Sequence, residues 1–499
     1  MMPIILLQIL LIPILASAVI FISRRWLGRA SGWIVSLALL YATFLAALAA
    51  IEVSSGRIIT EQYLLIAPGI RLGLLADGLS IPVLVVVLLL CTALSFYSIY
   101  YVKHRITVLY EKETEQVKIE HYARFFYLFP FFPVGFIGTI LSTNLVSLYF
   151  FMEVLTITLF FLMAFFGYRE RVRVAFTSLS WGIIGALFFL VASLVVYNQL
   201  GSLEISNLGQ FSGTRFTTLA IVLFLIGLMI KLAMVPFHVW MPWVHAEHPT
   251  CIAGLLAVYA NLGLYVIVRV IVLPLGGDFE PFGAPLMVLA LVTMIYGSLL
   301  AMAQTDIKRL AACSTISQIS YSVLGLGSLT SNGVEGGLFF FLSHIMGKTV
   351  FFSTAGIIVY TTGIRDMREM GGLARKMPVT ACLWLMGCMM LSGFPPFSSF
   401  TAEWIMFSGI FERGLLDGGF GLMIAIGGLI AILLTVVYSF GSAHSIFFGP
   451  LSQELESRGL TDPSWTMTAP LLLIAVVSIL LGMYPEPVIE LLHSVVGTI

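Results

Sequence analysis

The chain has 499 residues, of which 59% are hydrophobic and 10% are charged, and its formal net charge at pH 7 is zero. A mean hydropathy of +1.04 excludes an ordinary soluble protein and indicates a membrane protein with many spans. The balanced charge gives no basic surface that would favour a nucleic-acid partner.

A membrane helix needs about 20 apolar residues, and on that rule we expect about fourteen spans. They cover residues 3–22, 30–51, 79–102, 123–142, 144–166, 172–198, 216–235, 250–275, 284–304, 306–329, 335–361, 379–412 (interrupted), 418–447 and 466–484. The predicted fold class is an all-α polytopic membrane protein. Residues 52–78 form the longest loop near the start of the chain and predict a small hairpin, and the amphipathic tail 485–499 predicts a segment at the membrane interface.

The lysines and arginines predict the orientation of these spans. Most of the 25 such residues fall in alternate loops on one side of the membrane. These are Arg24, Arg25, Arg29, Lys103, Arg105, Lys112, Lys118, Arg124, Arg169, Arg171, Arg173, Lys308, Arg309, Arg365, Arg368, Arg375, Lys376 and Arg458. The opposite side has Arg57, Arg71, Arg215, Arg269 and Arg413. Because loops rich in basic residues stay in the cytoplasm, we expect both termini on the outer face.

Prolines interrupt two of the predicted spans beside a buried charge. The span at 216–248 carries Lys231, followed by Pro236, His238 and Pro242. The span at 379–412 is interrupted by Pro395 and Pro396 and then carries Glu403. Proline cannot donate a helix hydrogen bond, so both spans are expected to be discontinuous helices of the kind that line ion sites in transporters. His238 and His245 flank the first break and could bond its freed carbonyls.

The spacing of the two breaks indicates an internal repeat. They lie about five spans apart, and an odd number of spans turns the second copy upside down in the membrane. We therefore expect an N-terminal three-helix segment at 1–121 and two inverted five-helix repeats at 122–275 and 284–447. The last transmembrane helix and the tail occupy 448–499.

Five ionisable residues lie well inside the predicted spans: Glu153, Lys231, His344, Lys348 and Glu403. An intramembrane charge is costly, so each is a candidate functional site. Each also has a structural alternative: an ion pair between helices for Glu153, an ordinary core histidine for His344 and a half-helix cap for Glu403. Together they predict a charge relay, in which Glu153 and Lys231 approach at mid-membrane directly or through one water.

Short motifs accompany these charges. They are Ala76-Asp77-Gly78-Leu79-Ser80, Phe151-Met152-Glu153, Pro236-Phe237-His238-Val239-Trp240-Met241-Pro242, His245-Ala246-Glu247-His248-Pro249-Thr250, Gln304-Thr305-Asp306-Ile307-Lys308-Arg309-Leu310, Ser343-His344 with Lys348, and Phe400-Thr401-Ala402-Glu403. With them the chain resembles the antiporter-like subunits of respiratory complex I, multisubunit cation/proton antiporters, membrane-bound hydrogenases and sulfane-sulfur reductases. The resemblance covers the third to thirteenth spans. It implies fourteen helices with an inverted repeat, and a glutamate–lysine pair whose separation drives proton movement along a central polar axis.

The glutamate at 403 resembles the M type of these subunits, since the other types have lysine there. Two positions depart from the family pattern. Asn261 stands where the M type has lysine, and Gln318 stands where histidine is common. Neither side chain can hold a transferable proton. We therefore expect a hydrated polar seam through Glu153, Lys231, Asn261, Gln318, Lys348 with His344, and Glu403.

The resemblance implies a subunit that translocates protons, or sodium ions, within a redox-driven complex of the plasma (inner) membrane of a prokaryote. Such a complex would be an NADH:quinone oxidoreductase, a membrane-bound hydrogenase or a sulfane-sulfur reductase. The five cysteines show no CxxC pair, haem motif or iron–sulfur spacing, so we expect no metal or cofactor in this chain. Its partners would be other membrane subunits, a peripheral redox arm reached through them, and lipid. Two alternatives stay open: a stand-alone cation/proton antiporter, and a structural membrane subunit with a degenerate pathway.

Overall fold

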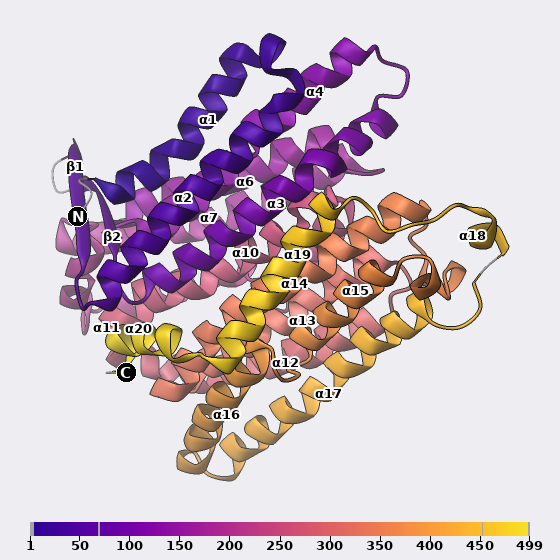
Figure 1. Ribbon diagram of the computed structural model, residues 1–499. Coiled ribbons are helices and arrows are strands. Elements are labelled where there is room, and N and C mark those ends of the chain that lie inside the picture. Colours follow the sequence, from indigo (N-terminus) through magenta and orange to yellow (C-terminus); the bar gives the residue numbers. More distant parts are fainter. Residues whose placement is uncertain (1–3, 68–69, 452, 498–499) are drawn as a thin grey trace.

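The computed structural model describes residues 4–67, 70–451 and 453–497. This part of the chain is a bundle of long helices with a single hairpin at one end (Figure 1). The elements of the first half are α1 (Ile5–Leu27), α2 (Ser31–Ser54), β1 (Ile59–Ala67), β2 (Ile70–Ala76), α3 (Ser80–Leu109), α4 (Glu115–Leu128), α5 (Phe131–Leu141), α6 (Leu145–Phe166), α7 (Arg171–Leu200), α8 (Thr217–Lys231), α9 (Met241–Glu247), α10 (Thr250–Ile267) and α11 (Leu273–Phe279).

The second half continues in the same way. Its helices are α12 (Gly283–Met302), α13 (Ile307–Gly327), α14 (Ser331–Thr362), α15 (Pro378–Leu391), α16 (Ser398–Leu416), α17 (Gly419–Phe447), α18 (Gln453–Ser457), α19 (Trp465–Met483) and α20 (Glu486–Val496). In the described residues, 9 helices or joined helical runs are long and apolar enough to cross a membrane. The polytopic helical fold is therefore confirmed, while the count of about fourteen spans stays a prediction.

The predicted hairpin is present. β1 pairs with β2 in an antiparallel two-stranded sheet, with Ile59 opposite Ala76. The chain also turns between the spans predicted at 123–142 and 144–166: α5 ends at Leu141, and the side chain of Asn144 caps α6 by accepting from the Ser147 amide at 2.8 Å. An asparagine before an apolar run supplies this cap because its side-chain oxygen satisfies an amide that has no helical partner.

α14 is one of the most enclosed of the long helices. It packs against α10, α13, α15, α16 and α19, and an 18-residue window of it is 100% buried. Small residues make this close packing possible. At Gly336, for example, an added Cβ would collide with the backbone of α16 at Met406. α14 therefore carries His344 and Lys348 in the middle of the bundle, away from its lipid-facing surface.

The amphipathic tail forms α20, which lies across α3 and α14 with Val488, Leu492 and Val496 buried. Nδ1 of His493 lies 2.7 Å from a carboxylate oxygen of Glu335, near the start of α14. The C-terminal helix is thus attached to the central helix of the bundle.

Candidate functional site

The helix that carries Lys231 ends at that residue. α8 stops at Lys231, a turn containing Ala233 in the left-handed conformation follows, and a short 3-10 helix leads into α9. The indole nitrogen of Trp240 donates to the freed carbonyl of Ile230 at 3.0 Å. Sequence reasoning gave this role to the histidines beside the break; the indole fills it instead. Pro236 and His238 lie in the segment that separates the two half-helices, and Pro242 lies in the first turn of α9.

Lys231 is buried, and its ammonium group lies against an aromatic residue of α10. Nζ is 3.4 Å from the hydroxyl of Tyr259 and 5.0 Å from the centre of its ring. The same hydroxyl lies 3.2 Å from Oγ1 of Thr156 on α6. Tyr259 therefore connects Lys231 with the helix that carries Glu153. No sequence signal singles out this tyrosine, since an aromatic residue in an apolar run is ordinary.

Glu153 and Lys231 do not touch directly. Among the described residues, no ion pair within 4.0 Å joins them, and Oε1 of Glu153 is buried without a hydrogen-bond partner. A cavity of about 10 Å³ lies beside Lys231, between Trp181 of α7, Trp240 and Tyr259. This is about the space that one water occupies. The pairing through a water stays a prediction, since the cavity borders Lys231 but Glu153 is not among its lining residues.

His344 and Lys348 share α14 but contact different neighbours. Nδ1 of His344 is 3.2 Å from Oδ1 of Asn261 on α10. Nζ of Lys348 donates to Oγ of Ser314 at 2.5 Å and to the carbonyl of Ala311 at 3.2 Å, both on α13. Lys348 is fully buried, and within the described part of the chain its hydrogen-bond partners are neutral. A buried lysine without a carboxylate partner is costly to keep charged, so its charge can be switched by its surroundings.

Gln318 belongs to a second polar cluster, between α13 and α17. Its amide nitrogen lies 3.1 Å from Oγ1 of Thr435 and 3.4 Å from the hydroxyl of Tyr438. The hydroxyl of Tyr321 also lies 2.9 Å from Thr435. The structure thus places Gln318 among neutral hydroxyl groups.

The second helix break holds Glu403. α15 ends at Leu391 and α16 begins at Ser398, with Pro395 and Pro396 between them. The carboxylate of Glu403 packs so closely against Gly393 that an added Cβ there would collide with it. Oε1 of Glu403 is buried without a hydrogen-bond partner, and the side chain lines a cavity of about 390 Å³.

A polar vestibule lies at the end of the bundle where α9 and α13 meet. It has a volume of about 540 Å³, and Glu247, Asp306 and Arg365 are among its lining residues. Arg365 pairs with Asp306 at 2.8 Å and with Glu247 at 3.4 Å. Behind it, the fully buried Lys308 donates to the carbonyl of His248 at 2.7 Å. From the sequence, Lys308 is expected in a loop at the membrane surface. The structure shows instead that it is buried, because the first turn of α13 packs inside the bundle.

Beyond the vestibule, two histidines have free ring nitrogens. Both nitrogens of His245 and both of His248 are buried without hydrogen-bond partners. His245 lies on α9 and packs with its ring 5.6 Å from that of Phe352 on α14. His248 contacts the buried Lys308 through its carbonyl, and His245 packs against α14, so the two histidines connect the region behind the vestibule with α14.

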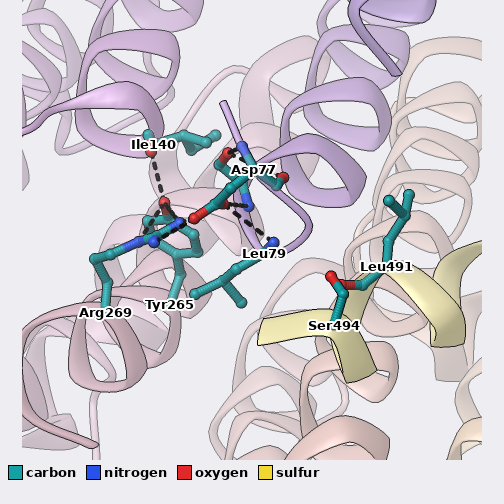
Figure 2. A network of polar contacts seen from close by, with 8 residues as sticks. Asp77, Leu79, Ile140, Tyr265, Arg269, Leu491 and Ser494 are labelled. Atoms are coloured by element: carbon teal, nitrogen blue, oxygen red, sulfur yellow. Dashed lines mark hydrogen bonds and ion pairs between the residues drawn. The ribbon is translucent and has the colours of Figure 1, made fainter. Parts of the chain in front are cut away.

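At the opposite end, the Asp77 motif ties three elements together (Figure 2). The carboxylate of Asp77 accepts two hydrogen bonds from Arg269, at 2.6 and 2.7 Å, and also accepts from the amides of Leu79 and Ser80 at the start of α3. Burial raises the pKa of Asp77, but the hydrogen bonds and charge of Arg269 outweigh it and hold the pKa below its usual value. Arg269 lies in a π-helical turn, Val268–Val272, at the end of α10.

The motif glycine completes this junction. Figure 2 shows Leu491 and Ser494 of α20 beside the loop that carries Asp77. A Cβ at Gly78 would collide with the carbonyl of Leu491 and the hydroxyl of Ser494. The motif therefore fixes the C-terminal end of α10, the helix that also carries Tyr259 and Asn261, against α3 and the C-terminal helix.

Three comparisons with known proteins bear on this arrangement. The family described as "NADH:quinone oxidoreductase/Mrp antiporter, TM" matches residues 142–435. A relative from Rickettsia bellii, "NADH-quinone oxidoreductase subunit M", is 28% identical over 363 residues, which cover 72% of this chain and 72% of that one. A Staphylococcus aureus relative, "Putative antiporter subunit mnhD2", is 30% identical over 323 residues, or 64% of this chain and 63% of that one.

Solved structures share the fold over nearly the whole chain. A chain of the Mrp complex from a Dietzia species has a TM-score of 0.86 at 21% identity and covers 100% of this chain and 98% of that one. A chain of respiratory complex I from Thermus thermophilus has a TM-score of 0.84 at 20% identity, covering 99% of each. A chain of the archaeal membrane-bound sulfane sulfur reductase has a TM-score of 0.83 at 22% identity, covering 97% of this chain and 77% of that one.

Proposed function

The chain belongs to the NADH:quinone oxidoreductase/Mrp antiporter family, and on this premise we propose that it translocates protons, or sodium ions, through its buried polar groups. It is an antiporter-like, multi-pass membrane subunit of the complex I and Mrp type. We propose the M type, in a prokaryotic plasma membrane, with other membrane subunits as partners and a peripheral redox arm reached through them.

The observation that carries the proposal is the environment of Lys348. A fully buried lysine held by a serine hydroxyl and a backbone carbonyl, with no ion pair of its own among the described residues, serves no evident structural purpose. A buried lysine that served only to stabilise the fold would have a carboxylate partner, because a buried charge without a partner destabilises a fold. A proton-holding site, by contrast, needs a group whose charged and neutral forms are both reachable.

The route we propose starts at the vestibule. Glu247, Asp306 and Arg365 hold water at its mouth, and His248 and His245 pass protons inward to Lys348. The route then divides along the midplane. Lys348 and His344 exchange protons with the first half through Asn261, whose amide orders water without titrating.

In the first half, we propose that Lys231 receives its proton beside Tyr259 and Thr156, with Glu153 as its partner through a water. In the second half, Gln318 and its hydroxyl neighbours lead toward Glu403. Moving a carboxylate near a buried lysine changes the lysine's affinity for a proton, which couples a distant event to ion release. The chemistry that drives this movement belongs to the partner subunits.

We also propose the finer topology. The two half-helix pairs, α8 with α9 and α15 with α16, have their breaks beside Lys231 and Glu403. This correspondence supports two inverted five-helix repeats at 122–275 and 284–447, preceded by the segment 1–121 and followed by 448–499. It also supports about fourteen crossings with both termini on the outer face.

Replacing Lys348 tests the function. We expect Lys348→Met to abolish proton or sodium uptake by the assembled complex in liposomes, while the complex still assembles, because methionine fills the same space without a charge. Lys112→Met, in an exposed loop, is the matched control and should transport normally. Undiminished uptake by the Lys348 variant would favour the structural-subunit alternative. Uptake by the isolated chain would favour a stand-alone antiporter.

A further inference from the structure

A long apolar groove lies on the outside of the bundle, away from the groups discussed above. It has a volume of about 330 Å³. α2 and α19 each pack against α3, so that α3 forms its floor and the other two helices form its walls (Figure 1). The lining residues that matter below are Trp33, Thr43, Thr92, Trp465 and Ala469.

The groove is apolar along its length, and its length is about the thickness of one membrane leaflet. From Trp33 to Thr43, α2 rises about 15 Å, which is half of the ~30 Å hydrocarbon thickness of a bilayer. The hydroxyls of Thr43 and Thr92 bond each other at 2.8 Å, so they present methyl groups to the groove. Trp33 and Trp465 lie at its shallow end with exposures of 44% and 74%, as tryptophans do at a membrane interface.

A basic pocket lies directly beyond this shallow end. It has a volume of about 170 Å³, and Arg29, Lys103 and Lys118 line it together with Glu115. Glu115 pairs with Arg29 at 3.3 Å and with Lys118 at 3.5 Å. In the described part of the chain, no ion pair involves Lys103, so positive charge is in excess.

The groove and the pocket are one turn apart on α3. Ile99 lines the groove and Lys103 lines the pocket. The hydroxyl of Tyr122, which also lines the pocket, donates to the carbonyl of Ile99 at 3.3 Å, so the two sites share a contact. Charge therefore lies where a lipid head group would be, and the apolar groove lies where its acyl chain would be.

We propose that this site binds one anionic diacyl phospholipid. The phosphate contacts Arg29, Lys103 and Lys118, and one acyl chain lies along α3 between α2 and α19. A zwitterionic lipid offers the same chains with no net charge, and a free phosphate offers charge with no chain. An anionic phospholipid matches both halves of the site. The lipid would join the first three helices to α19, which follows them by more than 350 residues in sequence.

The test measures lipid bound to the whole complex, stripped with detergent and then titrated. The probes are dioleoylphosphatidylglycerol, dioleoylphosphatidylcholine and inorganic phosphate, and native mass spectrometry counts the lipids that remain. We expect one tightly bound phosphatidylglycerol that phosphatidylcholine does not replace. The double variant Arg29→Gln with Lys103→Gln should lower the affinity for phosphatidylglycerol about ten-fold or more, as expected when two basic contacts are lost at a membrane surface. Arg173→Gln, an exposed arginine on the same membrane side, should not change it.

A second variant tests the groove itself. Ala469→Phe fills the wall on α19 from a half-exposed position and should also release the lipid. Val476→Phe, exposed on the same helix outside the groove, is its control. Equal binding of the two phospholipids, or binding unchanged by both site variants, would overturn the proposal. Full displacement of phosphatidylglycerol by inorganic phosphate, with no effect of Ala469→Phe, would reduce the site to an anion pocket and overturn it too.

Discussion

The side-chain oxygen of Asn261 lies 3.2 Å from Nδ1 of His344, which joins α10 of the first half to α14 of the second. The amide nitrogen of Asn261 donates to the carbonyl of Ala257 at 2.7 Å, so its oxygen faces the histidine. An amide oxygen only accepts, and Nδ1 must therefore carry a hydrogen. The proton that His344 can gain or lose then belongs to Nε2, which has no hydrogen-bond partner. Asn261 selects the tautomer of the histidine without titrating itself.

Removing this acceptor gives a first prediction. Asn261→Leu should lower ion uptake several-fold and reduce the free energy of unfolding by about 1–3 kcal/mol, because Nδ1 of His344 is left buried and unpaired. Uptake into liposomes and thermal unfolding of the complex measure the two effects. Asn207→Leu, which loses only a bond to Ser202 near the surface, should have little effect. Normal uptake by the Asn261 variant would show that His344 does not depend on this contact.

Tyr259 gives a second prediction, since its hydroxyl lies between Lys231 and Thr156. Tyr259→Phe keeps the ring under the ammonium group and removes only the hydroxyl. We expect slower ion uptake with a stability loss of about 0.5–1.5 kcal/mol, the usual value of one hydrogen bond. Tyr41→Phe, on a lipid-facing position with 47% exposure, is the control. If the two variants transport equally well, Lys231 reaches Glu153 by another route.

The elements that the sequence predicted well are those set by local chemistry. Long apolar runs define the helices, and prolines beside Lys231 and Glu403 mark the two breaks. The turn at Asn144 lies at the boundary predicted between the spans at 123–142 and 144–166, and the structure shows that the Asn144 side chain caps the second of them. Each of these signals lies within a few neighbouring residues, so the sequence alone displays it.

The groups that the sequence did not predict depend on contacts between distant helices. Lys308 reads as a loop cation, yet it is fully buried against the carbonyl of His248, 60 residues away. Tyr259 reads as an ordinary core residue, and its role depends on helices that carry Thr156 and Lys231. The predicted approach of Glu153 and Lys231, directly or through one water, stays a prediction: in the described residues no ion pair within 4.0 Å joins them, and α7 packs against both of their helices.

The ion pair of Asp77 with Arg269 gives a third prediction (Figure 2). Both side chains are about 10% exposed, so Asp77→Asn leaves a buried arginine uncompensated. We expect a loss of about 3–5 kcal/mol in the free energy of unfolding, as measured for broken buried pairs. Asp366→Asn removes the partner of the exposed Arg368 and should cost at most about 1 kcal/mol. Thermal unfolding of the two variants measures both losses of stability, and equal losses would contradict the prediction.

The same pair predicts a pH dependence. The pKa of Asp77 is below the ordinary value of 3.8 in the folded chain. A carboxyl group with a lowered folded-state pKa stabilises the fold above its unfolded-state pKa, and this stabilisation is lost as the pH falls through the folded-state pKa. The wild-type chain should therefore lose stability below about pH 4, whereas Asp77→Asn should lose less over that range. If the free energy of unfolding falls equally with pH in the wild type and in Asp77→Asn, the predicted pH dependence is wrong.

The last prediction concerns Gly393, where the backbone turns beside Glu403 with φ of 63°. Gly393→Ala adds two effects: strain in the left-handed conformation, about 1–2 kcal/mol, and a collision with the Glu403 carboxylate. Gly201 has the same φ of 63°, is left-handed with ψ of 10°, and has open space around its Cα, so Gly201→Ala carries the strain alone. Any difference between the two variants therefore reports on the position of Glu403. We expect Gly393→Ala to be less stable and to transport poorly, and Gly201→Ala to transport normally. If both variants transport like the wild type, the position of Glu403 against Gly393 does not control ion movement.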